Sequence, residues 1–170
     1  MSTSTRSLIP RAVCLGIAGG FRAWPPLAAV ALGYDAAPVK RGWRRWPVLR
    51  SKWGRGLLIA LGAGEFVTDK LPRTQSRLAP TPQLSRIDGG LFGRVALVGL
   101  AGAALGTEYR GRHPAVTGAV FGALGAILGN YGGYHARKAV VEATGLPDPA
   151  VAVVEDLATI ALLAAAVRGR

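Results

Sequence analysis

The chain has 170 residues, of which 50% are hydrophobic, 18% are charged and 24 are glycine, and its formal net charge is +12. This length suits one domain, and glycine at about twice its ordinary usage argues against a well-filled soluble core while favouring helices that pack closely in lipid. A large positive charge is also typical of nucleic-acid-binding proteins, but here the cations lie in loops between apolar runs, where anionic lipid head groups would meet them, so we expect no nucleic-acid partner.

Five apolar segments follow one another, at about residues 8–32, 53–71, 89–106, 114–136 and 149–167. A helix needs roughly 20 residues to cross the hydrocarbon core, and each segment comes close to that length. The first contains Arg22 and is interrupted by Pro25 and Pro26, which should kink or break the helix because proline lacks a backbone donor. The sequence therefore predicts an all-α, polytopic membrane protein with about five short glycine-rich spans in one domain, residues 1–170.

A basic loop at about residues 40–55 connects the first two segments and interleaves seven cations with Trp43, Trp46 and Trp53. Tryptophan favours the membrane interface, and Lys and Arg favour anionic head groups, so we expect this loop to lie on the lipid surface. With five spans, the two ends of the chain would face opposite sides of the membrane. A small excess of cations on the side of this loop then places the loop in the cytoplasm.

Glycines recur at steps of three and four in the third and fourth segments, which is the spacing that lines one face of a helix. These two seams predict close helix packing, within the chain or in a homo-oligomer, and comprise Gly99, Gly102, Gly106, Gly118, Gly122, Gly125, Gly129 and Gly132 or Gly133. In addition, the stretch at 15–21 resembles the one at 128–134. The first and fourth spans would run in opposite directions, so this similarity predicts an inverted repeat, as in many transporters.

Ionisable side chains are costly inside a membrane and should be paired or line a polar cavity. Glu65 and Asp69 share one helix face near the end of the second segment, and Glu155 and Asp156 lie near the start of the fifth, which begins on the same side. The five-span topology makes this the side on which the chain begins. The predicted polar cluster comprises Arg22, Glu65, Asp69, Lys70, Arg77, Asn130, Tyr134, Arg137, Glu155 and Asp156.

Recognised catalytic and cofactor motifs are absent from the sequence. No His/Cys cluster has zinc-ligand spacing, and no P-loop, dinucleotide fingerprint or nucleophile motif is present, so we predict no dedicated metal site, name no cofactor and have no basis for an enzyme assignment. His113 and His135 are expected at the membrane interface, and Cys14 is expected to be a small buried residue.

Several motifs together resemble the bacterial membrane family called domain of unknown function 4126. They are Arg22-x-x-Pro25, the stretch from Gly64 to Pro72 with Ser76-Arg77, Gly129-x-Tyr-Gly-Gly-Tyr134, and Leu146-Pro-Asp148 leading to Glu155-Asp156. The stretch Arg73-Thr-Gln-Ser departs from the pattern where a second proline is expected, and the basic tryptophan loop looks like a local addition. The resemblance implies a multi-pass protein of the inner cell membrane and implies no activity.

Three functions fit these features. In the first, the protein is a small transporter or channel, in which Glu65, Asp69, Glu155 and Asp156 bind a cation, a proton or a cationic solute. The arginines Arg22, Arg77 and Arg137 would then balance charge or bind an anionic group. The second is a membrane enzyme that acts on a lipid or polyprenyl phosphate with a carboxylate-bound divalent metal. The third is a membrane scaffold. Against all three stands a structural interpretation, buried ion pairs that fix helix register, with Arg22 and Arg137 as counter-ions.

Overall fold

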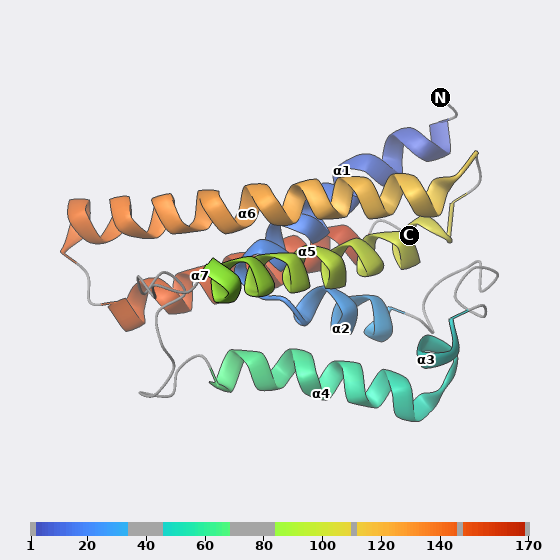
Figure 1. Cartoon of the computed structure of the whole chain (residues 1–170), viewed down its shortest axis with the longest axis horizontal. Helices are drawn as coiled ribbons and strands as arrows, with labels where there is room; N and C mark the ends of the chain where they lie inside the picture. The colour runs from blue at the N-terminus through green and yellow to red at the C-terminus, as the bar shows by residue number, and fades with distance from the viewer. Residues whose placement is uncertain (1–2, 34–45, 69–83, 110–111, 146–147, 169–170) are drawn as a thin grey trace.

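The computed structural model describes residues 3–33, 46–68, 84–109, 112–145 and 148–168, and every regular element in these ranges is an α-helix. The predicted all-α class is therefore confirmed for the described residues. Figure 1 shows an elongated bundle whose longer helices follow its long axis. In chain order the helices are α1 (Thr3–Phe21), α2 (Pro25–Leu32), α3 (Pro47–Arg50), α4 (Lys52–Thr68), α5 (Leu84–Gly106), α6 (Pro114–Thr144) and α7 (Asp148–Arg168).

Among the described residues, two helices are long and apolar enough to cross a membrane. These are Pro114–Thr144 and Pro149–Val167, whose most apolar windows of 18 residues have mean hydropathies of 1.3 and 2.1. Ser7–Phe21 and Gly90–Gly106 are apolar but shorter. A span needs about 20 apolar residues, so the helices give limited support to a membrane location and do not confirm five spans.

The first predicted segment forms two helices that run in opposite directions. Helix α1 ends at Phe21 and α2 starts at Pro25, because Pro25 and Pro26 cannot donate the hydrogen bonds that would continue α1 yet fit the first turn of a new helix. Figure 1 shows α2 returning toward the end of the bundle where α1 starts. The chain thus reverses its direction at the proline pair, whereas a kinked helix would have continued in roughly the same direction.

This reversal places the start of α1 and the end of α7 at the same end of the bundle. The contact between them is direct, since Nε of Arg11 in α1 donates to the carbonyl of Ala166 in α7 over 2.7 Å. The two ends of the chain therefore do not lie at opposite ends of the bundle, as they would if residues 8–32 formed a single continuous helix.

Helix α1 is central and packs against α5, α6 and α7, while α2 packs against α4 and α5. Glycine allows α1 and α6 to touch along their backbones. A Cβ at Gly125 would lie 2.8 Å from the Gly16 Cα, and one at Gly129 would lie 2.8 Å from the Ile17 Cα. Residue numbers rise together along this contact, so α1 and α6 run parallel. The similar stretches 15–21 and 128–134 thus lie side by side in the same direction, and the predicted inverted repeat is wrong.

The second glycine seam joins α5 to α6. A Cβ at Gly102 would collide with the carbonyl of Gly118, and one at Gly106 would lie 2.9 Å from the Ala115 Cα. Most glycines of the predicted seams therefore serve helix packing inside one chain. Gly132 differs, because no atom lies within 4 Å of a Cβ added there.

Candidate functional site at a helix break

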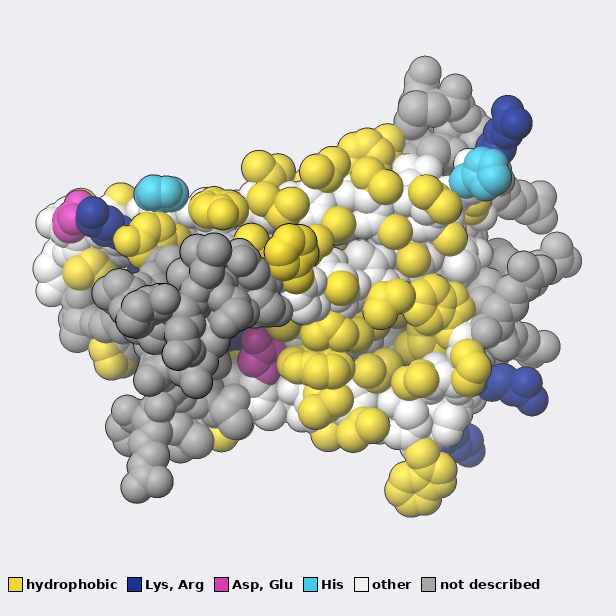
Figure 2. Space-filling view, in the orientation of Figure 1, with side chains coloured by type: hydrophobic (Ala, Val, Ile, Leu, Met, Phe, Trp, Pro, Cys, Tyr) yellow, Lys and Arg dark blue, Asp and Glu magenta, His cyan; other side chains and the backbone are white. Residues whose placement is uncertain are grey.

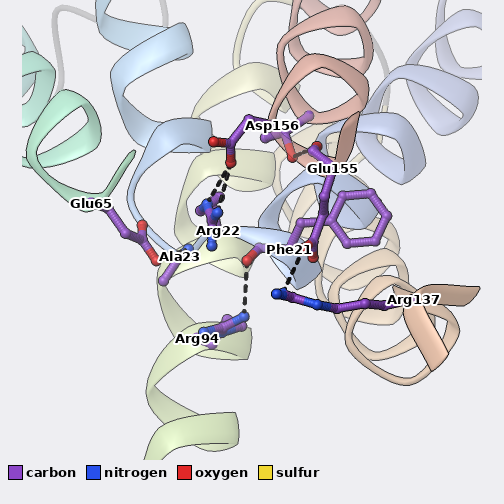
Figure 3. A network of polar contacts seen from close by, with 9 residues as sticks. Phe21, Arg22, Ala23, Glu65, Arg94, Arg137, Glu155 and Asp156 are labelled. Atoms are coloured by element: carbon purple, nitrogen blue, oxygen red, sulfur yellow. Dashed lines mark hydrogen bonds and ion pairs between the residues drawn. The ribbon is translucent and has the colours of Figure 1, made fainter. Parts of the chain in front are cut away.

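The break between α1 and α2 gathers most of the charged side chains that lie inside the described bundle. A helix end leaves backbone groups without partners, and here the carbonyl end of α1 and the N–H end of α2 meet within residues 20–25. Figure 3 shows that side chains from four other helices surround this point.

Arg94 of α5 binds the carbonyl end of α1. Its Nη1 donates to the Gly20 carbonyl over 2.6 Å and approaches the Phe21 carbonyl at 3.4 Å. A cation at the negative end of a helix dipole is stabilising, and it also satisfies carbonyls that have lost their helical donors. Arg94 is not among the predicted cluster residues, although a cation inside the third apolar segment is a signal that points to a polar site.

Glu65 of α4 binds the opposite side of the break. One carboxylate oxygen accepts the Ala23 N–H over 2.9 Å and the other accepts the Trp24 N–H over 2.8 Å. These N–H groups begin α2, so the negative charge lies at the positive end of the α2 dipole. Glu65 thus acts as an N-terminal cap that is supplied by a different helix.

Arg22, within the break, forms a buried ion pair with Asp156 of α7. Its Nε and Nη2 donate to Asp156 Oδ1 over 3.1 and 2.6 Å. Arg22 is 2% exposed and Asp156 is 6% exposed. The guanidinium also lies over the Phe66 ring, 5.8 Å from its centre. Each charge needs the other, because a buried charge that loses its partner is strongly destabilising.

A second ion pair joins α6 to α7 beside the first. Arg137 Nη1 donates to Glu155 Oε2 over 3.3 Å. The Arg22–Asp156 pair matches the structural interpretation of the sequence, in which buried ion pairs fix helix register with Arg22 and Arg137 as counter-ions. The Arg137–Glu155 pair is only partly buried, because 34% of the Arg137 side chain is exposed.

The other predicted site residues have different places. Asn130 of α6 lies against the break, because a Cβ on Gly20 of α1 would collide with the Asn130 backbone nitrogen. Tyr134 is exposed, and its ring makes an edge contact with the His135 ring, with the two ring centres 5.1 Å apart. Asp69, Lys70 and Arg77 lie outside the described residues.

The described cluster is balanced in formal charge. Its cations are Arg22, Arg94 and Arg137, and its carboxylates are Glu65, Glu155 and Asp156. Within the described part of the chain no group of three or more His, Cys, Asp or Glu side chains could hold a metal ion. To bind one of these described charged groups, a charged ligand would therefore have to compete with the partner that the group already has.

Replacing Arg94 by leucine should lower the free energy of unfolding by about 1.5–3 kcal/mol, the usual contribution of a hydrogen bond to a charged group. The loss would arise because the carbonyls at the end of α1 lose their donor. Thermal unfolding of the purified protein in detergent would measure it. Arg112→Leu is the matched control, since Arg112 is exposed at the start of α6. Equal stability of the two variants would show that Arg94 does not hold the break.

No curated protein and no solved structure is detectably similar to this chain. Residues 9–168, nearly the whole chain, match one protein family. The motifs from which the resemblance was drawn fall within this match and include the helix break, Glu65 and the Glu155–Asp156 pair. The chain therefore belongs to the family described as "Domain of unknown function (DUF4126)".

Proposed function

We propose that this chain is a multi-pass membrane protein of the transporter or channel type, and that its ligand site is the helix break between α1 and α2. The single observation that carries the proposal is the pair of half-helix ends held by Arg94 and Glu65. Discontinuous helices inside membrane transporters place such ends at the site where substrate and coupling ions bind.

The surface of the described bundle supports a membrane setting. Figure 2 shows hydrophobic side chains spread across the middle of one face, while most of the Lys and Arg side chains drawn there lie at the two ends. Large apolar residues such as Phe92 at 70% and Leu128 at 63% are exposed on α5 and α6. Soluble monomers rarely expose an apolar surface of this extent, whereas lipid would cover it. The inner cell membrane is the location we propose.

The ligand we propose is a proton or a small cation that binds at Glu65. A bound cation would compete for the carboxylate with the N–H groups of Ala23 and Trp24, and so would loosen the start of α2. Because α2 packs against both α4 and α5, a shift of this short helix would be transmitted to its neighbours. The balanced charges at the break are consistent with such an exchange, since a bound cation would take the place of an existing interaction.

No observation on the described residues specifically favours the enzyme alternative. In the scaffold alternative the glycine seams would bind partner helices, but most of the seam glycines already contact other helices of this chain, while Gly132 has no atom within 4 Å of an added Cβ.

The Glu65→Gln variant tests the proposal. The amide oxygen can accept one of the two backbone N–H groups, but the amide nitrogen cannot accept the other. The variant should therefore insert with somewhat lower stability than the unaltered protein, while its cation flux falls to that of empty vesicles. The flux would be measured in proteoliposomes under imposed proton, Na⁺ or K⁺ gradients, each with an internal dye that is sensitive to that ion. Glu142→Gln is the matched control, because Glu142 lies on the exposed part of α6.

Two results would contradict the proposal. In the first, the unaltered protein would carry no more of any of the three cations than empty vesicles do. In the second, Glu65→Gln would carry as much as the unaltered protein. If Glu65→Gln failed to fold, the comparison of the unaltered protein with empty vesicles would still decide whether the protein carries any of the three cations.

A further inference from the structure

Residues 46–55 comprise α3 and the first residues of α4, and they form a bend, here called the elbow, at the end of the bundle where α1 starts (Figure 1). It presents three kinds of side chain to the outside. Trp53 is 90% exposed and Val48 is 50% exposed. The basic side chains Arg50 and Lys52 lie beside them and are also exposed. A large ring of this kind is costly to leave in water, so its position calls for a partner.

The elbow has a fixed conformation, so the exposure of Trp53 is imposed by the fold. Leu49 is 1% exposed and joins the hydrophobic core. Arg55 Nη1 donates to the Leu49 carbonyl over 3.0 Å, and the Gly54 N–H donates to Ser51 Oγ over 3.3 Å, which caps the start of α4. These contacts direct Leu49 inward and leave its neighbours outside.

Positive charge is concentrated at this end. Arg112, at the start of α6, adds to Arg50 and Lys52. At the opposite end the described cations lie beside carboxylates, since Arg137 pairs with Glu155 at 3.3 Å and Lys138 with Glu142 at 3.9 Å.

We propose that the elbow is an interface anchor that lies in the anionic head groups of the cytoplasmic leaflet, so that the start of α1 and the end of α7 both face the cytoplasm. Tryptophan favours the head-group level, and Lys and Arg favour both anionic lipid and the cytoplasmic side of a membrane. The chain reversal at Pro25 is what brings the two ends to this side. The inference rests on the proposed membrane function.

Reporter fusions test the orientation. Green fluorescent protein at either end of the full chain should fluoresce, and alkaline phosphatase at either end should be inactive, in a Gram-negative host. Ends on opposite sides, or both ends outside, would overturn the inference while leaving the membrane proposal intact. Recovery of the protein in the aqueous fraction would instead contradict the membrane proposal itself.

Lipid quenching tests the anchor. The emission of Trp53 in proteoliposomes is obtained by subtracting the emission of a Trp53→Phe variant from that of the unaltered protein. That emission should be quenched more strongly by lipids brominated near the head group than by lipids brominated near the chain ends, and it should shift to shorter wavelength when phosphatidylglycerol is added to phosphatidylcholine. Absence of quenching, stronger quenching by the deep label, or no response to phosphatidylglycerol would each refute the anchor. Leu57→Ala, one turn further along α4, is the control and should leave the Trp53 signal unchanged.

Discussion

Replacing Arg22 by methionine should lower the free energy of unfolding by about 3–5 kcal/mol, because the Asp156 carboxylate would then be buried without its counter-charge. The double variant Arg22→Met/Asp156→Leu should recover most of that loss, since apolar residues that replace a buried ion pair are often as stable as the pair. The free energies of unfolding in detergent would be measured for both single variants, Arg22→Met and Asp156→Leu, and for the double variant. This double-mutant cycle would give the coupling energy between the two residues.

The control for this cycle is the exposed ion pair of Lys138 with Glu142, which joins positions four apart on α6. Removing Lys138 should change stability by less than about 1 kcal/mol, because exposed pairs contribute little. If Arg22→Met were no more damaging than Lys138→Met, or if the double variant were as unstable as the worse single one, the buried pair would not stabilise the contact between the helix break and α7.

Substituting alanine for glycine at two positions of α6 should change stability in opposite directions. At Gly125 the new methyl group would lie 2.7 Å from the Val13 carbonyl oxygen and 2.8 Å from the Gly16 Cα, so α1 would have to move away. Such overpacking typically costs about 1–3 kcal/mol. At Gly132 no atom lies within 4 Å of the added Cβ, so the better helix propensity of alanine should stabilise the protein by up to about 1 kcal/mol.

This pair of variants shares one helix and one type of substitution, so helix propensity contributes about equally to both. The difference between their unfolding free energies therefore reports the contact of α6 with α1. Thermal unfolding in detergent would measure it, and the yield of monodisperse protein would give a second readout. Equal effects at Gly125 and Gly132 would show that the parallel α1–α6 contact is not formed.

Much of the candidate site could be predicted from the sequence because it depends on neighbouring helices of the same chain. When successive segments run in alternating directions, the second segment ends, the fourth ends and the fifth begins on the same side whatever the first segment does. Glu65, Glu155, Asp156 and Arg137 were therefore expected together, and the structure gives each of them a partner in one network. The network lies toward the opposite end from the start of α1, however, because α1 and α2 form a returning pair.

The role of each charge could not be predicted in the same way. Two residues four apart in sequence share a helix face, but nothing local shows that the Glu65 carboxylate accepts N–H groups of residues 41 and 42 positions earlier. The same is true of Arg94, which binds a carbonyl 74 positions earlier. Such contacts depend on where whole helices pack, so they follow from tertiary structure alone.

By itself the sequence determined the helical class, the position of the break at the proline pair and the faces of the helices that pack, because backbone donors and small side chains act locally. Only the tertiary structure decided the direction of the chain after the break, the parallel contact of α1 with α6 and the partners of the charged side chains. The physical reason is that a proline can end a helix without specifying the direction of the next one. That direction is fixed by the surfaces that α2 buries against α4 and α5, and those surfaces come from distant parts of the chain.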